Sequence, residues 1–545
     1  MTTDSRIDRL PWGTGDDSQV WLVHFGSKST PLIAQLLREL GVRTRILNHA
    51  DDELTLAAAD DSKLPKMVIL SGGDQSVYDA NAPTIRQGTF EQLRKNCFLL
   101  GICYGAQLLA KLSGGEVRRA KMGEAGLVQV RLSEDSASFS GYRGGRAIMN
   151  HGDEIERLPE GWQRVASTDD CQNAFVCSDR IWAVQFHPEM GHTENGRELL
   201  FGAIKRAGVS IDYRVDHAKF VETAASWMRE QAPQGTVLCG LSGGVDSSVA
   251  FRIAELAFGE RLHGIYVNTG WFREGETDEV RNVFGSRHVS YVDASEEFYE
   301  ALDRVEYPVG LKPTEAEYRY YEAVRKCIGA KFIDVFVGHA RGLGRPASAL
   351  IQGTNAADII ESQTGLKSHH NVALPKQLGV NILEPLAGLY KSEIRALAHH
   401  LGLPDEIANR QPFPGPGLAI RTWGKLDRSY APPLRQANLI LEEVVRKHYP
   451  DQENRPCQYY VALVPLASTG LIGDERVIGY AWAVRMVWSE DRESYASLEV
   501  KALTQQVQDV LSKRLTSEVR MEDGTRFVRV FYELTGKPPS TTEPH

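Results

Sequence analysis

Two series of short apolar runs, separated by amphipathic stretches, constrain the fold of this 545-residue chain more than any other feature. In the first series each run ends on glycine or polar residues, and helical patterns such as residues 31–40 lie between some of the runs. These runs are VWLVHFG (20–26), MVILSGG (67–73), CFLLGICYG (97–105) and IWAVQFHPE (181–189). Strands that alternate with helices are typical of α/β domains with a mainly parallel sheet. We therefore expect such a domain from residue 18 onward.

A second series of the same kind begins near residue 236. Its expected strands are TVLCGLSGG (236–244), LHGIYVNTG (262–270), HVSYVDAS (288–295) and FIDVFVGHA (332–340). The stretch RQPFPGPGLAIR (410–421) marks an ordered loop, because its prolines exclude it from a helix interior or a central strand. Beyond it, helical patterns (434–448, 498–519) are mixed with strand-like runs (459–466, 526–535), which suits a small α+β domain. The predicted organisation is an N-terminal extension, two tandem α/β domains and a small α+β domain, at residues 1–17, 18–205, 206–421 and 422–545.

Composition narrows the class of protein. With 42% hydrophobic and 24% charged residues, the chain is typical of globular proteins, and its net charge of −9 argues against a general nucleic-acid binder. Seven scattered cysteines without a CxxC pair predict neither a disulfide framework nor a structural zinc site. The polar N-terminal segment is not typical of a signal peptide, and no apolar run is long enough to span a membrane. We expect a cytoplasmic enzyme.

Cys103 lies where a strand pattern changes abruptly to a helix, between Gly101 and Gly105. A nucleophile on such a turn stands above the sheet edge, and the N-terminus of a helix supports a thiolate. His187 ends the run 181–187, and Glu189 follows two residues later, on the same side of an extended segment. A lone cysteine is most often a buried apolar residue, but these three residues together favour a nucleophile with its base and orienting acid.

The stretch SGGVDSS (242–248) separates an apolar run from a helical pattern, which is an arrangement that binds anions. Gly243 and Gly244 would let backbone N–H groups approach phosphates, and Asp246 would hold Mg²⁺. Further donors would be the hydroxyls of Ser242, Ser247 and Ser248. The stretch lacks the lysine of the P-loop and resembles the pyrophosphate loop of the ATP pyrophosphatases, which cleave ATP between its α and β phosphates. A plain Ser/Gly turn is the alternative, and SGG alone would be weak evidence.

GICYGAQLLA, SGGDQSVYDANAP and VQFHPEMGHTENG resemble the triad-type glutamine amidotransferases over about residues 18–205. The resemblance implies that Cys103 attacks the glutamine amide, forms a thioester and releases ammonia, while His187 transfers protons and Glu189 orients His187. It also implies an oxyanion hole and a glutamine contact, made by the backbone N–H groups of Gly73 and Tyr104 and by Gln107. His24 and Asp74 depart from the family pattern without touching the triad.

From about residue 18 to the C-terminus, the chain resembles the glutamine-hydrolysing GMP synthase family. The matching stretches are VNTGWFREGE, RKCIGAKFIDVF, LIQGTNAADIIES, LKSHHNV, ILEPLAGLYKSEIR, QPFPGPGLAIR and the tail GKPPSTTEPH. The resemblance implies ATP contacts at the Val267 backbone and Lys391, and metal ligands at Asp246, Asp358 and Glu361. It implies an acceptor-nucleotide site with Arg273, Lys537 and Glu543, and a lid that carries Lys367, His369 and His370. His369 and His370 could instead bind a metal, although no third ligand is evident.

The implied reaction is the ATP- and Mg²⁺-dependent amination of xanthosine 5′-phosphate to GMP through an adenylylated intermediate, by a homodimer. Departures from the family pattern gather in the acceptor half of the chain. The stretch HHNVALP is one residue shorter than its family counterpart, and QGTNAAD stands where the family has QGT-x-Y-P-D. Residues 489–497 also differ from the family, and the tail ends in TEPH. A paralogue that aminates a related purine nucleotide is therefore the alternative. A tRNA-modifying ATP pyrophosphatase would favour basic segments, and a regulatory protein with inactive sites would not keep Cys103, His187 and Glu189.

Overall fold

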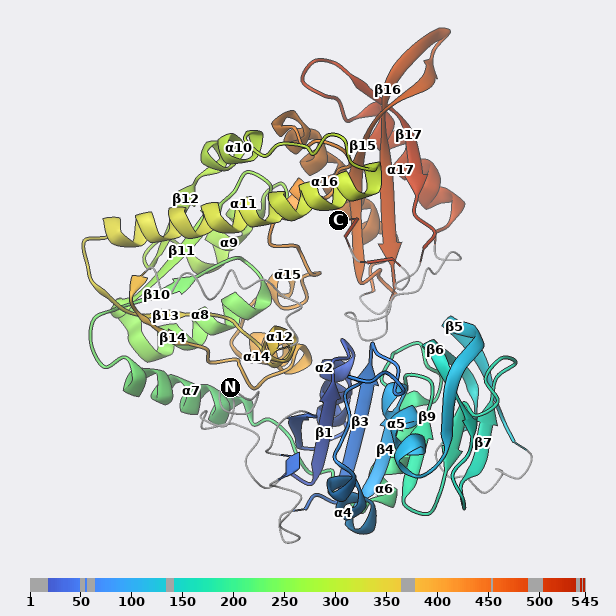
Figure 1. Ribbon diagram of the computed structural model, residues 1–545. Coiled ribbons are helices and arrows are strands. Elements are labelled where there is room, and N and C mark those ends of the chain that lie inside the picture. Colours follow the sequence, from blue (N-terminus) through green and yellow to red (C-terminus); the bar gives the residue numbers. More distant parts are fainter. Residues whose placement is uncertain are drawn as a thin grey trace. The chain divides into compact units, whose positions relative to one another are not determined.

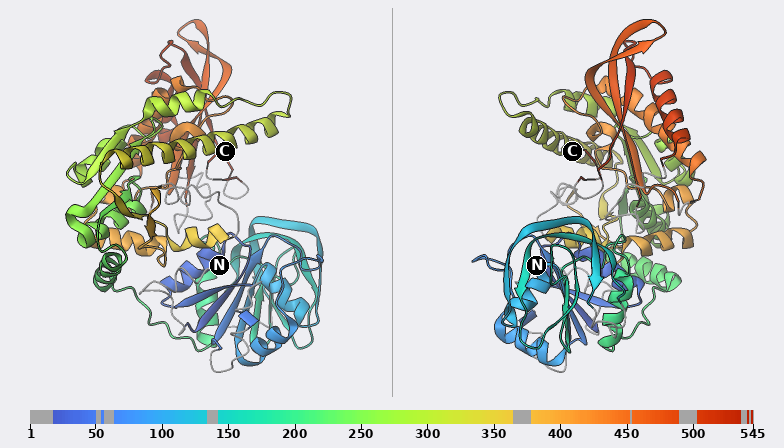
Figure 2. Two further views of the ribbon diagram at one scale, coloured as in Figure 1. Left: turned by 60° about the vertical axis from the view of Figure 1, so that its left-hand side comes forward. Right: turned by 90° about the vertical axis from the view of Figure 1, so that its right-hand side faces the viewer.

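The computed structural model describes residues 18–49, 54–55, 64–133, 142–363, 378–451, 454–488, 503–535, 540–541 and 543–544. The chain forms two compact units (Figures 1 and 2). Unit 1 comprises residues 1–223, 354–368 and 386–393, and unit 2 comprises residues 224–353, 369–385 and 394–545. In the described part of the chain, no helix is long and apolar enough to cross a membrane. The domain boundaries expected at residues 205 and 421 stay predictions.

A nine-stranded sheet of order β2-β1-β3-β4-β9-β8-β7-β5-β6 forms the centre of unit 1 (Figure 1). Its neighbouring parallel strands are β2 (Thr44–Asn48), β1 (Val20–Phe25), β3 (Met67–Gly73), β4 (Phe98–Ile102) and β9 (Ile181–Val184). Antiparallel pairs extend it through β8 (Phe175–Cys177), β7 (Gln163–Ser167), β5 (Glu116–Leu132) and β6 (Gly145–Arg157). The expected parallel α/β core is confirmed. The antiparallel extension was not predicted, because β5 and β6 carry mostly exposed and half-buried residues rather than apolar runs.

Helices cover both faces of the parallel strands. Successive residues of β1 point to opposite faces, so that Leu22 and Val23 belong to different core clusters. The cluster around Leu22 includes residues of α2 (Thr30–Glu39) and α6 (Gly196–Arg206). The cluster around Val23 includes residues of α4 (Gln87–Asn96) and α5 (Tyr104–Leu112).

Two later segments of the chain also pack within unit 1. Ile360 of α12 (Ala356–Gln363) and Tyr390 join the core cluster on the α2 side. The guanidinium of Arg38, on α2, lies 3.6 Å from the carboxylate of Glu393, and only 8% of the Arg38 side chain is exposed. Arg38 also lies over the rings of Tyr213 and Tyr390. Because α14 (Lys391–His400) begins at Lys391, this buried ion pair fixes its first turn against α2.

Unit 2 contains a fully parallel five-stranded sheet of order β12-β11-β10-β13-β14. Its strands are β10 (Thr236–Gly240), β11 (Leu262–Asn268), β12 (Val289–Asp293), β13 (Ala347–Ile351) and β14 (Asn381–Leu383). Its helices include α8 (Val245–Phe258), α9 (Glu276–Phe284), α10 (Ser295–Asp303), α11 (Pro313–Gly342) and α15 (Asp405–Ala408), with the short turn η3 (Gly259–Arg261). Helix α7 (His217–Gln231) crosses the boundary between the units.

The expected strand at 332–340 is wrong, since these residues form the last part of α11. Their buried members are Ile333, Val335, Phe336, Val337 and Ala340, and all of these except Val335 are three or four residues from another one, which is the spacing of one helix face. The β-branched residues gave the run a strand-like composition, but the strands that pair with β10 are β11 and β13. Short apolar runs are ambiguous between a strand and a buried helix segment.

The C-terminal part of unit 2 is α+β, as expected. A three-stranded sheet of order β15-β16-β17 packs against two helices, and the elements are β15 (Gln458–Ile472), β16 (Glu475–Val487), β17 (Arg526–Tyr532), α16 (Ala431–His448) and α17 (Gln505–Ser517). Trp482 of this sheet and Phe336 of α11 belong to one continuous hydrophobic cluster. The Pro/Gly-rich stretch joins the two parts as a loop that ends in the turn η4 (Gly417–Ile420), followed by η5 (Arg428–Tyr430).

Candidate active sites

The turn that carries Cys103 is strained and tightly packed. Cys103 lies between β4 and α5 with φ 53° and ψ −110°, a conformation that non-glycine residues rarely adopt. A Cβ atom added at Gly101 would lie 2.6 Å from the backbone nitrogen of Ala106, and one at Gly105 would lie 2.2 Å from the carbonyl oxygen of Leu70. Both glycines are therefore required by close approach of the backbone, and together they hold the cysteine in its strained position.

His187 and Glu189 form a buried pair beside this turn. The distance from His187 Nδ1 to Glu189 Oε1 is 2.8 Å, and both residues are buried. The backbone of His187 is fixed on two sides, because its N–H donates to the Ile148 carbonyl and its carbonyl accepts from Thr193 Oγ1 at 2.7 Å. The structure thus brings together the three residues predicted as a triad.

Opposing effects set the protonation of His187. Burial lowers its pKa, but the Glu189 carboxylate and hydrogen bonds with Cys103 and Glu189 outweigh burial and raise the pKa well above its ordinary value. An imidazolium at this position would stabilise a neighbouring thiolate. The arrangement can therefore supply a thiolate–imidazolium pair, which is the reactive form of a cysteine nucleophile.

Replacing Glu189 with glutamine tests this assignment. We expect kcat/KM for glutamine hydrolysis to fall about 100-fold, because an amide orients and charges the imidazole less well than a carboxylate. The substitution removes a negative charge that raises the His187 pKa, so His187 loses its proton at a lower pH. The alkaline limb of the pH–rate profile therefore shifts to lower pH. Glu198→Gln, on the exposed side of α6, serves as the control. An unchanged alkaline limb in Glu189→Gln would contradict the assigned role.

The two predicted oxyanion donors are neighbours in space. A Cβ atom at Gly73 would lie 3.1 Å from Tyr104 Cγ and 3.0 Å from the Phe25 carbonyl, so the end of β3 approaches the start of α5 closely. The N–H of Tyr104 belongs to the first turn of α5, where backbone donors have no partner within the helix. This position suits an oxyanion hole, and the roles of Gly73 and Tyr104 stay predictions.

Gln107 reaches the thiol through a second glutamine. Its Nε2 donates to the Asp153 carbonyl at 2.9 Å and to Gln185 Oε1 at 3.1 Å, while Gln185 Nε2 lies 3.7 Å from Cys103 Sγ. Gln107 is almost completely buried in this arrangement. A direct contact between Gln107 and the substrate glutamine stays a prediction.

The segment Asn150–Asp153 of β6 is a part of this site that sequence reasoning missed. Cys103 Sγ lies 3.7 Å from the Asn150 carbonyl, and the Asp153 carboxylate accepts from the hydroxyls of Ser76 and Tyr78. Asp153 therefore holds the segment that follows Gly73. The available signal was an acidic residue that directly follows a His-Gly pair and precedes the apolar Ile155.

His151 of this segment lies close to Glu124 and Cys171, and one ligand-type atom of each of the three residues is within 4.8 Å of the others. They form the one group of three possible metal ligands in the described residues. His151 already contacts Glu124 at 3.0 Å and the Asp153 carbonyl at 2.9 Å, and Thr168 donates to Glu124 at 2.6 Å. Burial and the Glu124 charge raise the pKa of Cys171 to about 12, so the thiol stays protonated. We interpret the group as a hydrogen-bonded network that supports β6.

The loop 242–248 of unit 2 has the form that an anion site requires. Gly243 has φ +76°, and a Cβ atom there would lie 2.7 Å from a methyl group of Val280. The loop is held by its own serines: Ser242 N–H donates to Ser247 Oγ at 3.2 Å, and Gly244 N–H donates to Ser242 Oγ at 3.3 Å. Helix α8 begins at Val245, so its N-terminus lies at the loop.

Other predicted ATP residues lie around strand ends and helix starts. Ser248 is fully buried and Val267 nearly so, the latter near the carboxyl end of β11, and their ATP contacts stay predictions. Asp358 accepts from the Asn355 N–H at 3.2 Å while its own N–H donates to Asn355 Oδ1 at 3.0 Å, which is a reciprocal cap of α12. Asp246 lies in the first turn of α8, and both carboxylates offer the oxygen ligands that Mg²⁺ prefers. Outside the described residues or side chains lie Glu361, Lys367, His369, His370 and Lys537.

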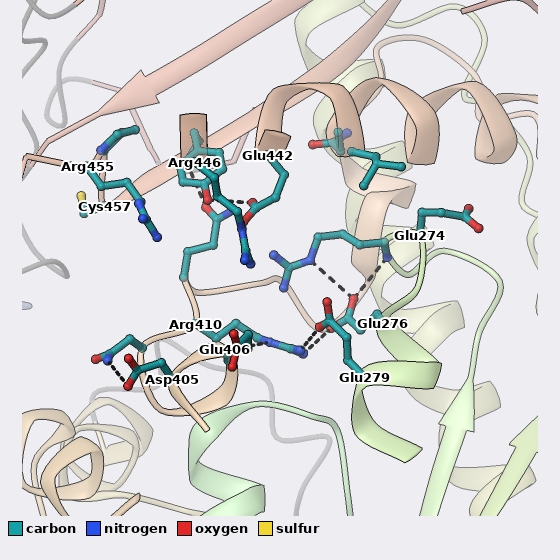
Figure 3. A pocket seen from close by; sticks show the side chains of 17 residues that line it. Glu274, Glu276, Glu279, Asp405, Glu406, Arg410, Glu442, Arg446, Arg455 and Cys457 are labelled. Atoms are coloured by element: carbon teal, nitrogen blue, oxygen red, sulfur yellow. Dashed lines mark hydrogen bonds and ion pairs between the residues drawn. The ribbon is translucent and has the colours of Figure 1, made fainter. Parts of the chain in front are cut away.

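A pocket of about 180 Å³ in unit 2 includes the predicted acceptor residue Arg273 (Figure 3). Its charged lining residues are Arg273, Arg410, Arg446, Arg455, Glu274, Glu276, Glu279, Asp405, Glu406 and Glu442. Carboxylates outnumber guanidinium groups, so the pocket as a whole does not favour an anion. The Arg273 guanidinium lies 4.5 Å from the centre of the Phe413 ring, and its Nε lies 3.5 Å from Glu276 Oε2.

Arg410 joins this pocket to the loop 242–248. Its Nη1 donates to the Gly243 carbonyl at 3.2 Å and to Glu276 Oε1 at 3.0 Å, and its Nη2 donates to Glu279. Only 8% of the Arg410 side chain is exposed. Sequence reasoning noticed the stretch RQPFPGPG but gave its arginine no role.

The predicted tail residue Glu543 forms a two-pronged ion pair with Arg421, in which both N–O distances are 2.8 Å. Arg421 is buried, and its guanidinium lies 5.1 Å from the centre of the Phe413 ring and 4.5 Å from that of Tyr460. Phe413 thus has the Arg273 guanidinium and the Arg421 guanidinium within reach of its ring. Of the predicted acceptor residues, Arg273 therefore contacts Phe413 directly, and Glu543 is connected to Phe413 only through Arg421.

Two family models match separate parts of this chain, and relatives match nearly all of it. Residues 21–207 match the family model described as glutamine amidotransferase class-I, and residues 445–544 match the model described as GMP synthase C terminal domain. A GMP synthase [glutamine-hydrolyzing] of Clostridium botulinum is 36% identical over 541 residues, which cover 96% of this chain and 99% of the relative. A protein of the same name from Rhodopseudomonas palustris is 37% identical over 99% of this chain and 97% of its own length. Another, from Dinoroseobacter shibae, is 37% identical over 97% of this chain and 99% of its own length.

Proposed function

The chain belongs to the family of glutamine-hydrolysing GMP synthases, and on that premise we propose that it aminates xanthosine 5′-phosphate to GMP. Glutamine supplies the nitrogen, and ATP activates the C2 oxygen of the acceptor as an adenylate. The other products are glutamate, AMP and pyrophosphate. The observation that carries the proposal is one chain that holds both the Cys103–His187–Glu189 arrangement and the SGGVDSS loop at the start of α8.

The glutaminase half rests on the geometry around Cys103. The thiolate attacks the amide carbon of glutamine, and the resulting oxyanion would accept hydrogen bonds from the N–H groups of Gly73 and Tyr104. His187 gives its proton to the leaving ammonia and then takes one from the water that hydrolyses the thioester. Glu189 keeps the imidazole oriented during both steps and stabilises its protonated form before ammonia leaves and after water is deprotonated.

The synthetase half rests on the loop 242–248. Its glycines, serines and the N-terminus of α8 would bind the β and γ phosphates, which leave as pyrophosphate. Mg²⁺ would be held at the carboxylate oxygens of Asp246, where it would neutralise charge on the leaving group, while the metal-ligand role of Asp358 stays a prediction. Arg273 and Glu543 would contact the acceptor nucleotide.

We propose that the protein acts as a homodimer through the C-terminal sheet. Large apolar side chains are exposed on its strands and next to them, namely Leu466, Leu471, Ile478, Phe531 and Leu534. In Figures 1 and 2 the β15–β16 hairpin reaches beyond the rest of this sheet. Exposed apolar patches on soluble domains are typical of protein–protein interfaces.

A panel of purine nucleotides tests the proposed acceptor. The protein is incubated with ATP, Mg²⁺, glutamine and one nucleotide at a time, and AMP and pyrophosphate are measured. We expect xanthosine 5′-phosphate to give the highest kcat/KM and GMP to accumulate. If a different purine nucleotide drives turnover and xanthosine 5′-phosphate is inert, the acceptor assignment is wrong, and the altered lid and tail stretches would be the first residues to examine for specificity.

Replacing Glu543 with glutamine tests the tail. In the free protein Glu543 neutralises the buried Arg421, so the substitution leaves that guanidinium without its ionic partner. We expect the KM for the nucleotide to rise about tenfold, whereas the basal glutaminase rate stays unchanged. Glu522→Gln, an exposed carboxylate near the start of β17, is the matched control. If Glu543→Gln and the wild type have equal KM values for the nucleotide, Glu543 is not part of the acceptor site.

A further inference from the structure

The carboxylate of Glu276 contacts two arginines, Arg273 and Arg410, and its contact with Arg410 is drawn in Figure 3. Arg273 is a predicted acceptor residue, whereas Arg410 contacts the loop 242–248. Glu276 Oε1 accepts from Arg410 Nη1 at 3.0 Å, and Glu276 Oε2 accepts from the Arg273 backbone N–H at 3.2 Å. Only 5% of the Glu276 side chain is exposed, so water screens these contacts weakly. Glu276 is the first residue of α9, which fixes its position in the chain.

Arg410 connects Glu276 to the loop 242–248. Besides Glu276, its Nη1 binds the Gly243 carbonyl at 3.2 Å. In a trans peptide the carbonyl of one residue and the N–H of the next point in opposite directions. Holding the Gly243 carbonyl toward Arg410 therefore aims the Gly244 N–H away from Arg410, where it lies 3.3 Å from Ser242 Oγ. This N–H is one of the donors proposed for the phosphates.

We propose that Glu276 is a positioning residue for the adenylylation step. It holds Arg410 on the Gly243 carbonyl, and so orients the Gly243–Gly244 peptide for pyrophosphate, while its other oxygen fixes the backbone at Arg273 on the acceptor side. The acceptor end of this inference rests on the proposed function, whereas the pyrophosphate end depends only on the loop.

A structural ion pair is the competing interpretation. Such a pair would affect folding and every activity of unit 2 to a similar degree. A positioning role instead weakens the binding of pyrophosphate and lowers the rate of ATP cleavage in a protein that is otherwise intact. The two interpretations therefore differ in ligand binding measured at equal amounts of folded protein.

The test uses Glu276→Gln, Arg410→Gln and the double variant in the full chain. Binding of Mg²⁺–pyrophosphate is measured by titration calorimetry, and pyrophosphate release is measured with ATP, ammonium and xanthosine 5′-phosphate. We expect each single variant to bind pyrophosphate about tenfold more weakly and to turn over about 10- to 100-fold more slowly. The double variant should have an affinity for pyrophosphate and a turnover rate within about threefold of those of the more impaired single variant, because both substitutions break the same contact. Basal glutaminase activity should not change.

The control is Asp278→Asn, which removes an exposed carboxylate from the first turns of the same helix. If Glu276→Gln binds pyrophosphate as well as Asp278→Asn does, the inference is wrong, whatever the acceptor is. Multiplying losses in the double variant would also overturn it. A wild-type protein that binds pyrophosphate but releases none from ATP with any purine nucleotide would instead contradict the proposed function and with it the acceptor end of the inference.

Discussion

Replacing Cys103 with alanine is expected to abolish glutamine-dependent amination while ammonium-dependent amination continues. The thiolate forms the covalent bond to the glutamine amide, so its loss should lower the glutamine-dependent rate about a thousandfold or more. The synthetase residues lie elsewhere in the chain, and external ammonia needs no thioester. The measurement is GMP formation from xanthosine 5′-phosphate with ATP, using either glutamine or an ammonium salt as the nitrogen source.

Cys177→Ala is the matched control, because Cys177 belongs to β8 of the same sheet and burial raises the pKa of its thiol. This control should keep both activities. Glutamine-dependent turnover that persists in Cys103→Ala would mean that another residue is the nucleophile.

Replacing Asp246 with asparagine is expected to abolish most ATP cleavage while glutamine hydrolysis continues. An amide is a poorer Mg²⁺ ligand than a carboxylate, and it leaves the charge of the departing pyrophosphate less well neutralised. We expect ATP cleavage to fall about a hundredfold or more with either nitrogen source, while the basal hydrolysis of glutamine remains.

Glu255→Gln, near the other end of α8, is the control for a lost carboxylate on the same helix. It breaks only a half-buried ion pair with Arg252, so ATP cleavage should be close to that of the wild type. ATP cleavage that is unaffected in Asp246→Asn would refute the assignment of the loop to pyrophosphate.

Features that local sequence determines were predicted well. The turn at Cys103 could be anticipated because two glycines, a strand end and a helix start lie within five residues of each other, and the structure shows that both glycines are sterically required. The pairing of His187 with Glu189 follows from their separation by two residues. The loop at 242–248 has the same local character, since the hydrogen bonds among its own residues connect positions at most five apart.

Features that depend on distant parts of the chain were not predicted. Arg410 is 167 residues from Gly243 and 134 from Glu276, so no local pattern indicates that they touch. Arg421 and Glu543 are 122 residues apart, and only the folded chain shows that the tail carboxylate has a buried partner. The strand expected at 332–340 failed for a related reason, because burial against neighbouring elements, rather than β-branched composition, decided that it is helical.

The central claim is that one chain moves nitrogen from glutamine to a purine nucleotide at the expense of ATP. The most direct test is a single reaction with amide-¹⁵N glutamine, ATP, Mg²⁺ and xanthosine 5′-phosphate labelled with ¹⁸O at C2, followed by mass spectrometry. The account predicts ¹⁵N in GMP, ¹⁸O in AMP, and equal amounts of GMP, AMP and pyrophosphate. AMP without ¹⁸O, ADP in place of AMP, or GMP without ¹⁵N would contradict it.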